Sequence, residues 1–306
     1  MAPRPQCLFL APHLYMPPFI SIPSVFLSLP EYGLPPALTL PASCIAMQLY
    51  LIRHAETVHN VGKVLAGTTD SALTNHGVAQ VNCLAQHFVS NSTRFMTVFS
   101  SDLNRARITA EGICHAQVSL SDGTPLQPIL TRNLREKDYG SMEGRFWNTS
   151  LPSPRPQGWV IPESKASMRQ RADNFFNKHL LPLLMRDPHG QQNIAVVAHG
   201  IILQELWSYF IEIFNPADTK VAPGIYDTNM TTLHRRPVWS NTGYTTVLIT
   251  PNLTERAVLP TVMPKFAFVV LGIDDKKHLA NLRRTKGGIG TAAHDVKQKR
   301  IDQFFQ

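Results

Sequence analysis

The chain has few cysteines and no long apolar run, and each shortage excludes a class of protein. Its four cysteines lie far apart and form no Cys-x-x-Cys pair, which argues against a disulfide framework and against a zinc site. No stretch reaches the roughly 20 consecutive apolar residues that a membrane helix needs. We therefore expect reduced thiols, no membrane segment, and a location in the cytoplasm or the nucleus.

Acidic residues are also scarce, with 21 Asp and Glu against 29 Lys and Arg, which gives a net charge of +8. A basic chain suits an anionic partner such as a phosphorylated substrate, a nucleic acid or a membrane surface. Much of the excess lies in residues 272–306, which hold eight Lys or Arg and four Asp. The remainder is only mildly basic, so we expect no direct binding of nucleic acid.

Proline divides the chain into regions of different character. Residues 1–46 contain 10 prolines, which prevent a continuous helix and interrupt the apolar run that a secretory signal would need. We interpret this region as a Pro-rich disordered extension, or as sequence upstream of a start at Met47. The expected organisation is this extension, a folded domain over residues 47–271, and a basic C-terminal tail over residues 272–306.

Within the expected domain, strand and helix patterns alternate along the chain. The expected strands cover residues 48–52, 94–100, 193–198 and 243–250, and the expected helices cover residues 75–91, 105–116 and 201–213. Such alternation predicts an α/β fold, a three-layer α/β/α sandwich with a mostly parallel central sheet. Residues 141–163 are rich in proline, glycine and polar residues, and we expect them to form a lid loop or insertion.

The first strand ends in an Arg-His pair, Arg53 and His54. Open α/β sheets bind ligands at the carboxyl ends of their strands. A neutral imidazole at this edge can attack phosphorus, and a guanidinium can make paired hydrogen bonds to phosphate oxygens. Two residues alone would equally fit a histidine bonded to backbone in a turn, so the interpretation depends on the surrounding pattern.

The surrounding pattern resembles the histidine phosphatase superfamily, in its phosphoglycerate-mutase-like branch. The similar segments are LIRHAETVHN (51–60), AGTTDSALTNHGVAQ (66–80), SDLNRARITA (101–110), LREKDYGSMEG (134–144) and VVAHG (196–200). The resemblance implies that His54 is a nucleophile that forms a phosphohistidine and that Glu136 is the general acid. It also implies a set of residues that bind phosphate or substrate: Arg53, Arg105, His199, Asn60, Gly67 and Tyr139.

The assignment of the acid leaves alternatives open. Glu136 lies in a charged run that would also suit a solvated surface, and Asp138 or Glu143 could be the acid instead. The chemistry that the resemblance implies needs neither a metal nor another cofactor, and the sequence contains no convincing cluster of metal ligands.

Two enzyme activities share these motifs, namely phosphate hydrolysis and phosphoglycerate mutation. Mutases of this family carry a lysine and an Arg-Arg pair in the lid, whereas the lid here has only the isolated Arg145, Arg155 and Lys165. Ala66 also replaces the hydroxyl residue that precedes the glycine in those mutases. Because a mutase must retain its phosphorylated intermediate, we predict a phosphomonoester phosphatase that acts on a small molecule or a phosphoprotein, with a mutase as the alternative.

The end of the chain carries a second, unrelated signal. Gln298, Ile301, Phe304 and Phe305 resemble the box that docks onto the replication sliding clamp. A short helical turn would present the apolar side chains to a pocket, although the same turn could pack on the protein's own surface. If this segment docks, a further alternative is a non-catalytic protein that binds phosphorylated ligands or the sliding clamp.

Overall fold

The computed structural model describes residues 47–117, 125–186, 192–214, 216–225, 236–251, 266–285 and 288–295. A seven-stranded sheet runs through these residues in the order β3-β2-β4-β1-β6-β7-β5. The strands are β1 (Met47–Arg53), β2 (Thr97–Ser101), β3 (Ile129–Thr131), β4 (Gln192–Ala198), β5 (Thr219–Val221), β6 (Tyr244–Pro251) and β7 (Phe266–Asp275). Four neighbouring pairs are parallel, and only β6 runs against its neighbours β1 and β7. The predicted mostly parallel sheet is confirmed.

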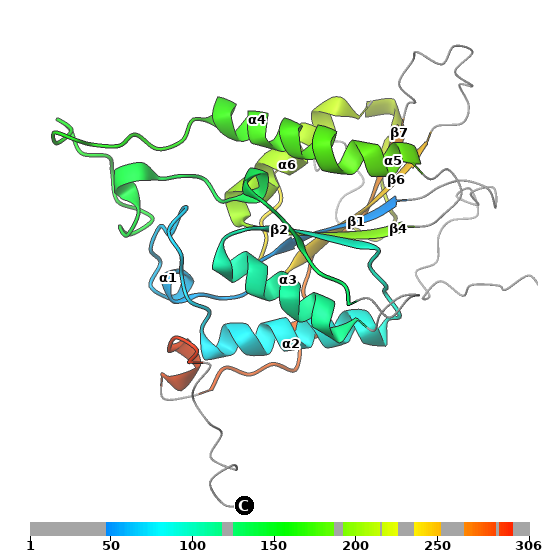
Figure 1. Cartoon of the computed structure of the whole chain (residues 1–306), viewed down its shortest axis with the longest axis horizontal. Coiled ribbons are helices and arrows are strands. Elements are labelled where there is room, and N and C mark those ends of the chain that lie inside the picture. The colour runs from blue at the N-terminus through cyan, green and yellow to red at the C-terminus, as the bar shows by residue number, and fades with distance from the viewer. Residues whose placement is uncertain are drawn as a thin grey trace, which may run out of the picture. The chain divides into compact units, whose positions relative to one another are not determined.

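Helices cover both faces of this sheet. The α-helices are α1 (Val58–Val61), α2 (Asn75–Ser90), α3 (Asn104–Ala116), α4 (Lys165–Phe175), α5 (Leu181–Arg186) and α6 (Gly200–Ile213). Helices α2 and α3 lie on one face, and α4, α5 and α6 lie on the other (Figure 1). The three-layer α/β/α architecture predicted from the sequence is therefore confirmed.

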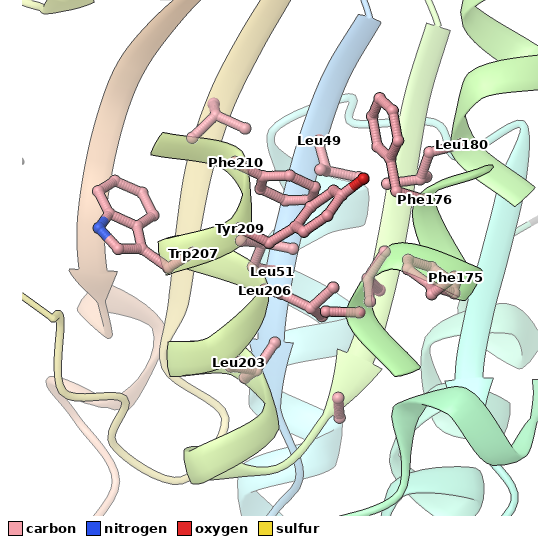
Figure 2. Packing of buried hydrophobic residues seen from close by; sticks show 14 of the residues in the cluster. Leu49, Leu51, Phe175, Phe176, Leu180, Leu203, Leu206, Trp207, Tyr209 and Phe210 are labelled. Atoms are coloured by element: carbon pink, nitrogen blue, oxygen red, sulfur yellow. The ribbon is translucent and has the colours of Figure 1, made fainter. Parts of the chain in front are cut away.

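The side chains of β1 explain why both faces are covered. Successive residues of a strand point to opposite faces, and both sets are apolar in β1. Leu49 and Leu51 belong to the cluster that includes α6 (Figure 2), whereas Tyr50 and Ile52 belong to the cluster that includes α2 and α3. Burial of apolar side chains on both sides of a strand is typical of the central strands of a parallel sheet.

Some elements were not predicted from the sequence. In α4 only Met168, Ala172 and Phe175 are buried among polar neighbours, so its apolar periodicity is weak. Strand β7 was also missed, and it spans the expected boundary between residues 271 and 272. Further along the expected tail, Asn75 donates to the backbone oxygen of Ile289 at 3.0 Å. Described residues beyond 271 thus contact the domain.

The structure does not describe residues 1–46 or the docking box at residues 298–306, so these two predictions lie outside the described residues. No helix within the described ranges is both long enough and apolar enough to span a bilayer. In the same ranges, His, Cys, Asp and Glu side chains form no group of three or more that could hold a metal ion.

Candidate active site

The candidate site lies where β1 and β4 end at the carboxyl edge of the sheet. The two strands are parallel, and their register pairs Arg53 with Ala198. The next residue of each strand is a histidine, and the amide of His54 donates to the carbonyl oxygen of Ala198 at 3.0 Å. The rings of His54 and His199 consequently lie side by side, with centroids 5.0 Å apart.

The protonation of His54 is set by its own loop. Its Nδ1 lies 2.7 Å from the carbonyl oxygen of Ala55, which can only accept a hydrogen bond. Nδ1 therefore carries the proton, and Nε2 keeps its lone pair. The side chain is only 4% exposed. Burial, and then the charges of Arg105 and Arg53, lower the pKa of His54 well below its ordinary value, so the imidazole is neutral near pH 7.

Arg105 determines which ring nitrogen of the second histidine, His199, carries the proton. Helix α3 carries the fully buried Arg105, whose Nε donates to Nδ1 of His199 at 3.2 Å. Because Nδ1 accepts this bond, Nε2 of the neutral His199 ring carries the proton. Two further N–H groups of Arg105 donate to the carbonyl oxygens of Thr69 at 2.8 Å and Gly67 at 2.6 Å. Burial, followed by the charge of Arg105, lowers the pKa of His199 well below its ordinary value.

Two nitrogen atoms at this edge are buried and have no hydrogen-bond partner among the described residues: Nε of Arg53 and Nε2 of His199. Arg53 uses another nitrogen, NH1, to donate to the backbone oxygen of Trp239 at 2.8 Å. Buried polar groups nearly always have partners, and each exception needs an explanation. Both atoms are N–H donors, so together they suit a ligand that presents several acceptor oxygens.

Glu136 lies beside these donors at the start of α6. Its carboxylate accepts hydrogen bonds from the backbone amides of Ile201 and Ile202, both at 3.2 Å, and from that of Lys137 at 2.9 Å. A Cβ atom placed on Gly200 would lie 3.9 Å from both Glu136 Oε2 and Arg53 Nε. The carboxylate of Glu136 and Nε of Arg53 therefore both approach Gly200, the first residue of the helix.

The two alternative acids have other surroundings. Glu143 accepts five hydrogen bonds from the loop at Thr68 and Thr69 and from the amide of Tyr139. Burial acts to raise its pKa, but these bonds outweigh burial and lower it. Asp138 is exposed and accepts a bond from the amide of Gly140. Glu143 is committed to holding a loop, and Asp138 faces solvent.

Gly67 belongs to the loop that Glu143 holds. Its φ is +55°, and an added Cβ would lie 2.0 Å from Oε1 of Glu143, so only glycine fits this conformation and this contact. The loop in turn supplies the two carbonyl acceptors of Arg105. Glycine at this position therefore contributes to the site through the placement of Arg105.

Asn60 and Tyr139 lie close to the site through different contacts. The Asn60 side-chain oxygen caps α1 by accepting from Thr57, and it also accepts from Asn241 Nδ2 at 3.1 Å. The same Asn241 nitrogen donates to the carbonyl oxygen of His54 at 3.0 Å. Burial, and then the charge of Glu136, raises the pKa of Tyr139 to about 12, so this hydroxyl is a hydrogen-bond donor near pH 7.

Sequence reasoning missed three residues that organise the site. Trp239 and Asn241 precede β6 and contact the loop of Arg53 and His54, and Arg171 on α4 contacts the backbone that leads to Glu136. None of the three lies in a motif, and Arg171 belongs to a helix that was not predicted. The antiparallel pairing of β6 with β1 explains the position of Trp239 and Asn241, because it brings the start of β6 to the end of β1.

The lowered histidine pKa values predict how stability depends on pH. In the unfolded chain these histidines take up protons as the pH falls through about 6.5, whereas in the folded protein they stay neutral to a lower pH. At low pH the unfolded state therefore binds more protons than the folded state does. The free energy of unfolding should consequently decrease as the pH is lowered from 7.5 to 5.5. The sign is the same for His278, whose pKa burial lowers to about 4.

Urea unfolding at these two pH values measures this effect. His278→Gln removes one contributing group and should reduce the difference between the two free energies. A protein equally stable, or more stable, at pH 5.5 would contradict the prediction.

Fold and site together define an α/β protein with a buried cluster of histidine and arginine side chains at its sheet edge. The family model of the histidine phosphatase superfamily, branch 1, matches residues 49–237. The chain belongs to this superfamily. The predicted family is thereby confirmed, and the named phosphatases among the similar proteins confirm the predicted enzyme class, a phosphoric monoester hydrolase.

Similar proteins include named phosphatases. A probable phosphatase of Schizosaccharomyces pombe is 29% identical over 259 residues, which cover 83% of this chain and 78% of that protein. The fructose-2,6-bisphosphatase TIGAR of Xenopus tropicalis is 33% identical over 164 residues, covering 50% of this chain and 56% of that protein. A solved variant of phosphoserine phosphatase from Entamoeba histolytica, in complex with phosphoserine, has a TM-score of 0.50 at 21% identity and covers 76% of this chain and 99% of that chain. At 21% identity, the likeness to the Entamoeba histolytica structure shows a shared fold alone.

Proposed function

We propose that this phosphatase hydrolyses phosphomonoesters through a phosphohistidine formed on His54. The observation that carries the proposal is a pair of buried N–H donors, Arg53 Nε and His199 Nε2, beside the neutral ring of His54; neither has a hydrogen-bond partner in the part of the chain that the structure describes. A phosphoryl group in transfer spreads negative charge over three equatorial oxygens. Fixed donors and two guanidinium groups in a buried site stabilise that charge without reorganisation.

In the proposed first step, Nε2 of His54 attacks phosphorus, and the bond between phosphorus and the leaving oxygen breaks. Glu136, protonated in the substrate complex, gives its proton to that oxygen so that it leaves as an alcohol. In the second step, a water molecule attacks the phosphohistidine and Glu136 takes up the water's proton. The N–P bond breaks, inorganic phosphate leaves, and both side chains return to their starting states.

Glu136 is favoured over the other two carboxylates by its neighbours. Its carboxylate lies at the start of α6 with Arg53 close by, whereas Glu143 is held by the loop at Thr68. The alternative of mutation rather than hydrolysis is disfavoured by the lid, which lacks the paired cations that retain a phosphorylated intermediate. Phosphorylated small molecules are the proposed substrates. The same two steps would also hydrolyse a phosphate ester on a protein side chain.

Hydrolysis of p-nitrophenyl phosphate in the presence of excess chelator tests this mechanism. A rapid quench in alkali, which preserves phosphohistidine, followed by peptide mass spectrometry should locate phosphate on His54. Turnover that requires an added divalent ion, or phosphate found on a hydroxyl side chain, would contradict the proposal.

We also propose, from the sequence alone, that Gln298, Ile301, Phe304 and Phe305 dock onto a sliding clamp, which would direct the enzyme to the nucleus as well as the cytoplasm. The supporting feature is the pattern of one glutamine followed by an aliphatic and two aromatic residues in a basic segment. Recovery of the full chain on immobilised sliding clamp, compared with the Phe304→Ala/Phe305→Ala variant, tests the idea. Equal recovery of both proteins would exclude it.

A further inference from the structure

Arg171 on α4 contacts the backbone of the segment that carries the proposed acid. Its NH1 donates to the carbonyl oxygen of Arg135 at 2.6 Å and to that of Asn133 at 3.2 Å. Its NH2 donates to the carbonyl oxygen of Glu136 at 3.4 Å. One guanidinium thus holds three carbonyl groups within four consecutive residues, and the last of them belongs to Glu136.

The opposite side of the same guanidinium is fixed by Glu163, which ends the lid. Nε and NH2 of Arg171 donate to the two carboxylate oxygens of Glu163, at 2.9 and 2.6 Å. The amide of Glu163 donates to the carbonyl oxygen of Asp138 at 2.7 Å, and the amide of Asp138 donates back to the carboxylate at 3.3 Å. The side chains of Arg171 and Glu163 are only 19% and 11% exposed. A planar guanidinium that bonds a carboxylate in this paired way has a fixed orientation.

These contacts leave the Glu136 carboxylate held from two directions. Its oxygens accept from the first amides of α6, and its backbone is held by Arg171 from α4. Helices α4 and α6 lie on the same face of the sheet (Figure 1), so both anchors belong to one packed layer. Arg171 donates no hydrogen bond to His54 or His199. Its charge contributes to the lowered pKa of His199, but less than burial and the charge of Arg105 do.

We propose that Arg171 is a positioning residue that, together with Glu163, holds the segment 133–136 so that the Glu136 carboxyl group can protonate the leaving oxygen. This inference rests on the proposed role of Glu136. Misplacement of a catalytic group by about 1 Å can cost on the order of 100-fold in rate. Loss of the three carbonyl contacts should therefore impair proton donation more than phosphate binding.

Proton donation matters most when the leaving oxygen is strongly basic. p-Nitrophenolate leaves without a proton, whereas the alkoxide from benzyl phosphate must be protonated as the bond breaks. We expect Arg171→Met to lower kcat/KM for benzyl phosphate about 10- to 100-fold and kcat/KM for p-nitrophenyl phosphate no more than about threefold. The ratio kcat/KM reports only the steps up to release of the leaving group. It therefore excludes the hydrolysis of the phosphohistidine, in which Glu136 is the proposed base for both substrates. Arg171→Lys keeps the charge but lacks the planar fork, and it should give the same selective loss to a smaller degree.

Arg169→Met is the matched control. Arg169 lies on the same helix, but its guanidinium pairs with Glu212 at 2.6 Å and lies over the ring of Tyr209. This variant should leave the ratio of the two kcat/KM values unchanged. Thermal unfolding of each variant reports whether it is folded, and Arg171→Lys carries the test if Arg171→Met does not fold.

The Glu136→Gln variant distinguishes a failure of the positioning role of Arg171 from a failure of the proposed acid role of Glu136. If Glu136→Gln shows the selective loss for benzyl phosphate and both folded Arg171 variants do not, the positioning role is overturned and the acid stands. An equal loss on both substrates in the Arg171 variants would likewise overturn it, because that pattern reports a general structural effect. If the kcat/KM of Glu136→Gln falls no further for benzyl phosphate than for p-nitrophenyl phosphate, the proposed acid is wrong.

Discussion

Replacement of His54 by alanine should abolish the hydrolysis of p-nitrophenyl phosphate, with a fall in kcat of about 10⁴-fold or more. The methyl group cannot attack phosphorus, and water would have to replace a nucleophile whose Nε2 is already deprotonated and held in place. Even a good leaving group should not rescue the variant, because the loss concerns the attacking atom. The phosphorylated peptide detected after an alkaline quench should disappear with the activity.

The measurement is steady-state hydrolysis in excess chelator, with the same quench applied to both proteins. His115→Ala is a suitable control, because this histidine is exposed in the last turn of α3 and should leave kcat unchanged. A His54→Ala variant that keeps a tenth of the activity would exclude a phosphohistidine at this position.

Arg105→Lys should lower kcat/KM about 10²- to 10³-fold, although it preserves the positive charge. An ammonium group cannot donate to His199, Gly67 and Thr69 in the directions that the planar guanidinium serves. Removal of the bond to Nδ1 of His199 also releases the tautomer that leaves a proton on Nε2. The fixed donors at the phosphate position should therefore be lost together with the cation.

The same variant should be less stable by about 1 to 3 kcal/mol, because the carbonyl groups of Gly67 and Thr69 lose their partner and the contact with Gly67 is buried. Arg107→Lys controls for the substitution on the same helix, since Arg107 pairs with Glu111 on the helix surface. Urea unfolding measures the loss of stability, and the ¹⁵N chemical shifts of the His199 ring measure the change of its tautomer. Retention of kcat/KM within threefold would show that Arg105 does not hold the phosphate.

The segment that carries Glu136 shows the limit of what a sequence motif can predict. The resemblance pointed to Glu136, but the charged run alone could not separate it from Asp138 or Glu143. Those three carboxylates differ by their partners. Glu136 accepts from the first amides of α6, Glu143 accepts from the loop at Thr68, and the exposed Asp138 accepts from the nearby amide of Gly140. The partners that distinguish Glu136 and Glu143 lie far away in the sequence, so no local pattern contains them.

The family, the α/β architecture and the meeting of His54 with His199 could all be predicted from the residues alone. These follow from local signals, because an apolar strand that ends in a polar residue predicts its own burial, and parallel strands bring their carboxyl ends to one edge. The folded structure was needed to establish which nitrogen of each histidine carries a proton, how Arg105 is held, and that Arg171 reaches the segment 133–136. Each of these depends on hydrogen-bond geometry between distant segments, which packing fixes to within tenths of an ångström and which residue order does not encode locally.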